Sequence, residues 1–214
     1  MNDIRDPEMH RNLALVASLA QMEADPDFVD LALLPKIAID LRYASANNFM
    51  GVDLYGAFNR AFLRKAAALQ LHRAVEALSK SHPDHRITVL DATRPRSVQR
   101  RLWAHVVGTQ QECYVANPDS GSIHNFGFAV DVTILDASGK ELDMGTAFDA
   151  FDDLSQPALE EQHWREWKLS DAQMENRRLL RESMAAGGYA QHPFEWWHFD
   201  AIGQVEARTY SIVE

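Results

Sequence analysis

The stretch Ser122-Ile-His-Asn-Phe-Gly-Phe-Ala-Val-Asp-Val-Thr-Ile134 decides most of what the sequence predicts about the fold. From Phe128 onward, large apolar side chains alternate with small or polar ones, which is the period of a β-strand with one face in a core. Asp131 lies on the small, polar face, which suits the floor of a site better than a core. A buried carboxylate must be paired, hydrogen-bonded or bound to a metal ion. Asp131 is therefore a candidate metal ligand.

Two histidines extend this candidate site. His124 precedes Gly127 in a bend that leads into the strand, and His198 ends the segment Glu195-Trp-Trp-His198 about seventy residues later. Two imidazoles and one carboxylate are a sufficient ligand set for a catalytic zinc ion that keeps a fourth position open for water. His124 alone would more often be a hydrogen-bonded loop residue. Together with Asp131 the two histidines predict one Zn²⁺ per chain.

Glu195 is the candidate general base beside this metal site. One geometric argument opposes that role. If Glu195 to Ala201 formed a regular closing strand, residues three apart would point to opposite faces, and Glu195 would diverge from His198. The catalytic interpretation requires Glu195 at the start of the strand, where Pro193 already breaks the regular backbone. The alternative is a surface glutamate that precedes a strand.

Arg94 is a candidate for stabilising negative charge. It follows a predicted strand, Arg86 to Asp91, and precedes Pro95, which favours an extended backbone at Arg94. An arginine at such a strand-to-helix turn can reach into a cleft, where it stabilises an oxyanion or binds a carboxylate. The alternative is an ordinary salt bridge with one of the many acidic side chains.

The sequence pattern of the whole chain predicts an α+β protein with a small, mainly antiparallel sheet flanked by helices. We expect residues 1–30 to be a helical N-terminal appendage and residues 31–214 to be a single domain that holds the predicted zinc site. The apolar patterns predict strands at residues 34–41, 86–91, 128–134 and 195–201. They predict helices at residues 59–81, at residues 97–107, and from Ser170, with a capping partner at Gln173, to Gly187-Gly188.

Composition excludes several classes of partner. The chain has 214 residues and a formal net charge of −10, and no Lys/Arg cluster is long enough to bind nucleic acid. Neither a positively charged leader nor an apolar run of roughly 20 residues is seen, so we expect a cytoplasmic protein with no membrane partner. Cys113 is the single cysteine, which fits a reducing compartment. Nothing in the sequence indicates an oligomeric state.

The pattern Ser-x-His-x-x-Gly-x-Ala-x-Asp followed by Glu-x-Trp-His resembles the zinc D-Ala-D-Ala peptidases. The resemblance extends from about Leu34 to Asp200. Three further stretches resemble the VanX-type dipeptidases within that group, namely Asp40 to Gly51, Arg94-Pro95, and Met144 to Asp149. The chain departs from the resemblance at Thr93, where an aromatic residue is expected, and over the first 30 residues, which have no counterpart.

The resemblance implies a fold like that of the D,D-peptidases and the hedgehog-type signalling domains. It implies that His124, Asp131 and His198 hold zinc. It also implies that Glu195 activates the attacking water and that Arg94 stabilises the tetrahedral intermediate. The implied substrate contacts are Ser122, Tyr43 and Asp149, with Asp149 holding the free ammonium group of a dipeptide.

The function that this resemblance implies is hydrolysis of D-Ala-D-Ala to two D-Ala by a metal-activated water. One alternative is a D,D-carboxypeptidase or endopeptidase that acts on peptidoglycan peptides. Another is a non-catalytic, zinc-stabilised binding module, although retention of both Glu195 and Arg94 argues against it. Antibiotic resistance, wall recycling and use of D-Ala as a nutrient all require the same chemistry.

Overall fold

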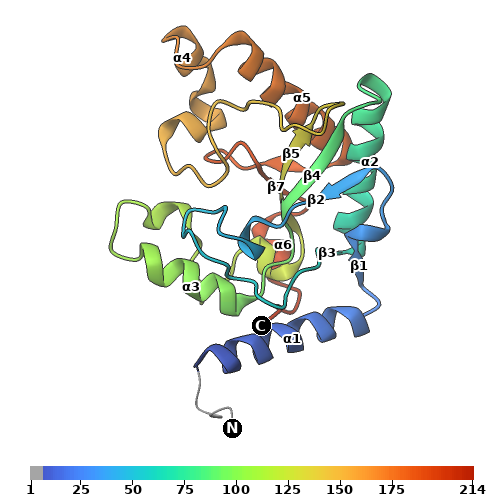
Figure 1. The fold of residues 1–214 in the computed structure, drawn as a ribbon, viewed down its shortest axis with the longest axis vertical. Coiled ribbons are helices and arrows are strands. Elements are labelled where there is room, and N and C mark those ends of the chain that lie inside the picture. The colour runs from blue at the N-terminus through green and yellow to red at the C-terminus, as the bar shows by residue number, and fades with distance from the viewer. Residues whose placement is uncertain (1–6) are drawn as a thin grey trace.

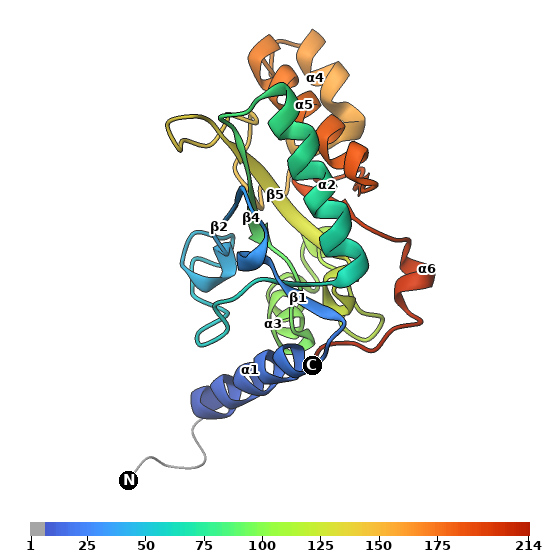
Figure 2. The same ribbon diagram turned by 90° about the vertical axis from the view of Figure 1, so that its right-hand side faces the viewer.

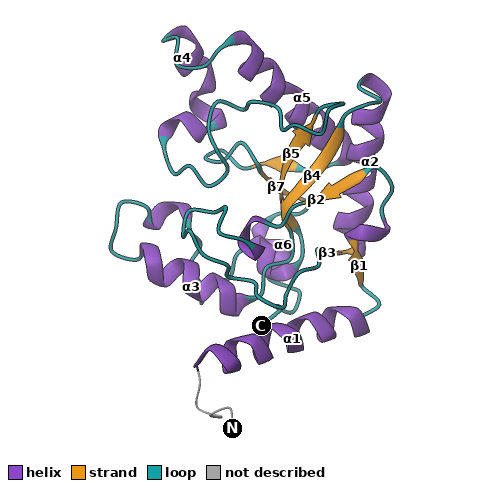
Figure 3. Ribbon diagram, in the orientation of Figure 1, coloured by secondary structure: helices purple, strands orange, loops and turns teal. Residues whose placement is uncertain are grey.

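The computed structural model describes residues 7–214 (Figure 1). Its helices are α1 (Pro7–Ala24), α2 (Lys65–Ser81), α3 (Arg96–Val106), α4 (Glu160–Arg165), α5 (Asp171–Gly187) and α6 (Gln204–Ala207). Its strands are β1 (Phe28–Asp30), β2 (Ile37–Ile39), β3 (Phe62–Arg64), β4 (Arg86–Asp91), β5 (Ala129–Leu135), β6 (Ala190–Gln191) and β7 (His198–Asp200). Long loops join these elements, as Figure 3 shows, and several of them carry the residues singled out from the sequence.

The main sheet has five strands in the order β2-β4-β5-β7-β6. Only β2 and β4 run parallel, and the other neighbours are antiparallel. The expectation of an α+β fold with a small, mainly antiparallel sheet is confirmed. Strand β5 lies at the centre of this sheet, so its two faces separate the core from the loops on the other side.

Helices α2 and α5 cover the core face of the sheet. Figure 2 shows them side by side against the strands, and Val130, Val132 and Ile134 of β5 are buried in the same core as the apolar stripe of α2. The two helices approach closely at Gly187. A Cβ atom there would lie 2.4 Å from the backbone carbonyl oxygen of Gln70, so no larger residue fits.

Local capping signals place α5 as expected. Ser170 and Gln173 form the predicted capping box, and Gly188 ends the helix in the left-handed conformation. Strand β4 has the predicted limits, Arg86 to Asp91.

Three expected elements are shorter than the sequence indicated. The helix expected from Asn59 begins only at Lys65, because Phe62–Arg64 instead form β3 and pair with β1. The strand expected at residues 34–41 is limited to Ile37–Ile39, and the closing strand expected at residues 195–201 is limited to His198–Asp200. The closing strand starts only at His198 because the residues before it form a turn, in which His198 N–H donates to the carbonyl oxygen of Glu195.

The N-terminal helix α1 lies along the end of the molecule where the C-terminus also lies (Figure 1). Leu15 and Met22 are buried, and the hydroxyl of Ser18 donates to the backbone carbonyl of Glu214. Within the expected appendage of residues 1–30, Pro7–Ala24 are helical and Phe28–Asp30 form β1, which pairs with β3; residues 1–6 lie outside the described residues. Over residues 7–214, the helices are either too short or too polar to cross a membrane.

Candidate metal centre and active site

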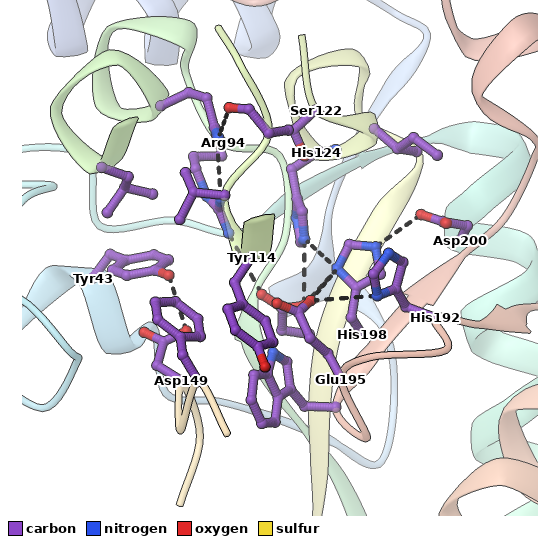
Figure 4. A pocket seen from close by; sticks show the side chains of 18 of the residues that line it. Tyr43, Arg94, Tyr114, Ser122, His124, Asp149, His192, Glu195, His198 and Asp200 are labelled. Carbon is purple, nitrogen blue, oxygen red and sulfur yellow. Dashed lines mark hydrogen bonds and ion pairs between the residues drawn. The ribbon is translucent and has the colours of Figure 1, made fainter. Parts of the chain in front are cut away.

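All eight site residues predicted from the sequence line one cavity of about 320 Å³ (Figure 4). Because side chains alternate along β5, Asp131 points away from the core face and toward this cavity. The cavity brings together segments from most of the chain. The predicted residues that line it are Tyr43, Arg94, Ser122, His124, Asp131, Asp149, Glu195 and His198.

The atoms of three of these residues converge on one point. His124 Nε2 lies 3.1 Å from His198 Nδ1, and Asp131 Oδ1 lies 3.3 Å from the first nitrogen and 3.1 Å from the second. A tetrahedral zinc ion with bonds of about 2.0–2.1 Å holds its ligand atoms about 3.3 Å apart. Asp131 Oδ1 is also buried without a hydrogen-bond partner among the described residues. The three side chains therefore fit a metal ion.

Both imidazoles are oriented by their outer nitrogens. His124 Nδ1 donates to the carbonyl oxygen of Ala92 at 2.7 Å, and His198 Nε2 donates to Asp200 Oδ1 at 3.0 Å. Because these acceptors require a proton on the outer nitrogen, the lone pair of each ring is on the other nitrogen, His124 Nε2 or His198 Nδ1. Both lone pairs point toward the place where the three candidate ligand atoms converge. The neighbouring imidazoles also act on Asp131. Burial alone would raise the pKa of Asp131, but His124 and His198 hold it well below its usual range.

Backbone geometry brings the three candidate ligands together. Asp131 and His198 are direct partners in the β5–β7 ladder. His124 lies in a short 3₁₀ turn that Ser122 and Asn125 cap, and Gly127 ends this turn with a φ of 81°. A Cβ atom at Gly127 would lie 2.9 Å from the ring of Phe28, so glycine is required there for space as well as for φ.

Glu195 lies beside the three ligand atoms rather than among them. Its Oε2 atom is 3.7 Å from His198 Nδ1 and 3.9 Å from His192 Nδ1. The regular strand expected from Glu195 is wrong, because residues 195–197 form a turn that His198 N–H closes by donating to the Glu195 carbonyl oxygen at 3.4 Å. This turn places the two side chains on the same side. Burial raises the pKa of Glu195 to about 7.

A buried network fixes the guanidinium of Arg94. Its Nε and Nη2 atoms donate to Asp91 Oδ2 at 2.8 and 2.7 Å, and its Nη1 donates to Gln99 Oε1 at 2.9 Å. Tyr55 donates to the other oxygen of Asp91, and the guanidinium lies 4.9 Å from the ring centre of Tyr43. Arg94 thus makes the salt bridge that was the alternative interpretation and also lines the cavity. Nη1 carries two hydrogens, and the one that is not donated to Gln99 is available to bind a ligand.

The Arg94 turn is joined to the His124 turn through the backbone. Arg94 N–H donates to the carbonyl oxygen of His124 at 3.1 Å, and Asn125 Nδ2 donates to that of Arg94 at 2.8 Å. Thr93 donates its hydroxyl to the Phe62 carbonyl oxygen at 2.6 Å. The aromatic side chain that the resemblance placed at position 93 is therefore absent, and the ring against Arg94 comes from Tyr43.

Asp149 lies across the cavity from the candidate metal ligands His124 and His198 (Figure 4). It is buried, has a φ of 60°, and accepts a hydrogen bond from Tyr43 Oη at 3.1 Å through Oδ1. Its Oδ2 atom has no hydrogen-bond partner among residues 7–214. Burial, reinforced by the nearby charge of Asp131, raises the pKa of Asp149 well above its usual range. Such a carboxylate is stabilised by any cation that enters the cavity.

The loop that carries Asp149 is held by Arg177 of α5. Arg177 is buried, and it donates from Nε to the Met144 carbonyl oxygen at 2.7 Å and from Nη2 to that of Leu154 at 2.8 Å. The two ends of the loop are thus fixed to one side chain. This restraint supports the left-handed backbone of Asp149, which a residue with a Cβ atom rarely adopts.

Several site residues were not found from the sequence. Strand alternation places Asp200, two residues after His198, on the same face of β7, but this pattern alone did not indicate that it holds the outer nitrogen of His198. Asp91 ends a predicted strand three residues before Arg94, which was a usable signal. Gln99 and His192 line the cavity without a pattern that distinguishes them from surface residues. Burial lowers the pKa of His192 to about 4.

Comparison with known proteins identifies the same family throughout. The family model described as D-Ala-D-Ala dipeptidase, a peptidase family, matches residues 22–214. A D-alanyl-D-alanine dipeptidase of Escherichia coli is 33% identical over 180 residues, covering 84% of this chain and 86% of the relative. A D-alanyl-D-alanine dipeptidase of Streptomyces coelicolor is 31% identical over 207 residues, covering 88% and 97%. A D-alanyl-D-alanine dipeptidase of Enterococcus faecalis is 29% identical over 196 residues, covering 83% of this chain and 92% of the relative.

Proposed function

The chain belongs to the D-Ala-D-Ala dipeptidase family of metallopeptidases, and from this premise we propose that it hydrolyses free D-Ala-D-Ala to two molecules of D-alanine at one zinc ion. The observation that carries the proposal is the cavity itself. It has a triangle of metal-ligand atoms at one side and an unpartnered carboxylate oxygen of Asp149 at the other. Two histidines and one carboxylate, with a neighbouring glutamate, are a donor set that suits zinc.

We assign the metal to His124, Asp131 and His198. When bound there, zinc supplies a Lewis acid for the scissile carbonyl and lowers the pKa of water. Glu195 accepts a proton from the attacking water as its oxygen bonds to the carbonyl carbon. The same carboxyl then gives the proton to the amide nitrogen as the C–N bond breaks, so that one dipeptide and one water yield two amino acids.

Arg94 stabilises the negative charge that develops on the carbonyl oxygen. Its guanidinium is already held by Asp91 and Gln99, so it needs little rearrangement when the charge appears. Ser122 uses its hydroxyl oxygen to accept from His124 N–H at 3.4 Å, which leaves the hydroxyl hydrogen for the substrate carboxylate.

Asp149 recognises the free α-ammonium group of the dipeptide. The Tyr43 hydroxyl holds Oδ1, and the ammonium takes the place at Oδ2. Binding of this cation favours the ionised form of Asp149, which the cavity alone disfavours. A substrate acylated on that nitrogen leaves the carboxylate unpaired. This requirement favours the dipeptidase over a carboxypeptidase for longer peptides.

We expect the unmodified protein to release D-alanine from D-Ala-D-Ala and to act poorly on N-acetyl-D-Ala-D-Ala. Asp149→Asn should lower kcat/KM for the free dipeptide by roughly 10- to 100-fold, the equivalent of one charge-assisted hydrogen bond, and should affect the blocked substrate less. A coupled assay for free D-alanine measures both. Efficient cleavage of a peptidoglycan pentapeptide would instead support the carboxypeptidase, and cleavage of neither substrate would reject the proposed function.

Arg94→Ala should lower kcat by about 10²–10³-fold and change KM much less, because the charge acts mainly in the transition state. Steady-state kinetics with D-Ala-D-Ala measure the two constants separately. Arg94→Lys is the matched control, since it keeps a charge near the buried Asp91 and limits unfolding. An effect confined to KM would make Arg94 an anchor for the substrate carboxylate.

We further propose a role in D-alanine and cell-wall metabolism in a reducing compartment, the cytoplasm. Cys113 is exposed and unpaired, which fits such a compartment. A small zwitterionic dipeptide fits the site because the cavity offers the Ser122 hydroxyl for its carboxylate and Asp149 for its ammonium group.

A further inference from the structure

Two aromatic rings separate the catalytic cavity from a second hollow. The cavity of about 320 Å³ and an outer hollow of about 780 Å³ share Tyr114 and Phe151 as lining residues. The two rings are stacked, with centroids 5.1 Å apart and planes within 8°. A single ring pair therefore forms part of the boundary on both sides.

This boundary lies next to the proposed amine site. Asp149 lines only the catalytic cavity, Phe151 lines both spaces, and Asp152 and Asp153 line only the outer hollow. One loop thus passes from the inner space to the outer one within a few residues. In the view of Figure 4, Tyr114 lies between Asp149 and Glu195. A substituent on the nitrogen held by Asp149 that extends toward the outer hollow therefore meets these two rings.

The ring pair is held in place from three loops. Phe151 also packs on Phe49, with ring centroids 4.8 Å apart, and Phe49 packs on His105 at 5.8 Å. Gln156 Nε2 donates to the hydroxyl of Tyr114 at 3.2 Å. These contacts join the loop of Phe49, the loop after α3 and the loop of Asp149. A ring fixed by this many neighbours acts as a wall and not as a freely turning side chain.

We propose that the stacked rings of Tyr114 and Phe151, a pair we call the aromatic wall, limit the substrate to a dipeptide by closing the side of the cavity that borders the outer hollow. This inference rests on the proposed function. It adds a steric restriction to the charge selection by Asp149. The carboxylate of Asp149 selects a free ammonium group, and the aromatic wall leaves no room for a peptide chain attached to that nitrogen. The outer hollow is lined mainly by polar residues, so opening the wall would connect the site to a surface that an extended peptide can occupy.

The test compares Tyr114→Ala and Phe151→Ala with the unmodified zinc-loaded protein. The measured quantity is the ratio of kcat/KM for N-acetyl-D-Ala-D-Ala to kcat/KM for D-Ala-D-Ala, and we expect it to rise at least tenfold in both variants. Tyr114→Phe is the matched control, because it keeps the ring and loses only the hydrogen bond from Gln156. That variant should keep the low ratio of the unmodified protein. Phe151→Leu, a milder change, should give a smaller rise.

Binding provides a readout that does not depend on turnover. Calorimetry with N-acetyl-D-Ala-D-Ala should show at least tenfold tighter binding to Tyr114→Ala than to Tyr114→Phe. Unchanged affinity and an unchanged kinetic ratio in a variant with a normal melting temperature would overturn the aromatic wall and leave the rings a purely structural role. Failure of the unmodified protein to cleave D-Ala-D-Ala would reject the proposed function, while calorimetry would still decide on the wall.

Discussion

Glu195→Gln should lower kcat for D-Ala-D-Ala by at least about 10²–10⁴-fold, the usual cost of losing a general base. Glutamine has nearly the same shape as glutamate but cannot accept a proton from water at neutral pH. The loss is larger still if the same carboxylate also protonates the leaving nitrogen. Because Oε2 lies 3.7 Å from His198 Nδ1, beside the ligand atoms, the metal content should remain near one per chain. Steady-state kinetics and elemental analysis of the purified variant measure the two quantities.

The control for this variant is Glu161→Gln, which removes a carboxylate from an exposed pair with Arg165 on α4. It should leave kcat unchanged. Near-normal turnover by Glu195→Gln would show that another group takes the proton. His192 is then the group to test, since its Nδ1 lies 3.9 Å from Glu195 Oε2.

The sequence predicted those parts of the fold that local patterns determine. Alternation fixed the face of Asp131, and a capping box with a glycine pair fixed both ends of α5. Strand β4 followed from a run of β-branched and apolar residues. In each case the decisive interactions lie within a few residues of one another, so a single window of sequence contains them.

Elements that depend on distant partners were predicted poorly. Residues 62–64 continue an apolar helical pattern, yet pairing with β1 makes them a strand. The proximity of Glu195 to His198 required a turn that no strand pattern indicates. Local propensity is a weak determinant where tertiary hydrogen bonds compete with it.

The site shows the same division. Its metal-ligating and acidic candidates could be named because their residue types are chemically distinctive. The complete support of Arg94 could not, because Tyr55, which holds Asp91 in place, lies 36 residues before Asp91 in the sequence and only the fold brings the two together. The same holds for the stack of Tyr114 on Phe151, which joins two loops without periodicity.

His124→Ala should remove both the metal and the activity. His124 Nε2 is one corner of the ligand triangle, and alanine leaves only Asp131 and His198, which is one ligand fewer than a catalytic zinc site has. We expect less than stoichiometric zinc after dialysis and no measurable release of D-alanine. Treating the unmodified protein with a chelator should produce the same loss, and adding zinc back should restore activity only where His124 is present.

Asp200→Asn tests a residue that orients a metal ligand without binding the metal itself, and we expect an intermediate loss of zinc affinity. Asp200 does not touch the ligand triangle but accepts a hydrogen bond from His198 Nε2, and losing such a partner typically weakens metal binding about 10–100-fold. His85→Ala, at a half-buried histidine after α2 that does not line the cavity, should have no effect. We therefore expect His85→Ala to bind zinc most tightly, Asp200→Asn to bind it less tightly, and His124→Ala to bind it most weakly. Full zinc occupancy in His124→Ala would remove this residue from the ligand set, because a carboxylate and one imidazole would then be sufficient.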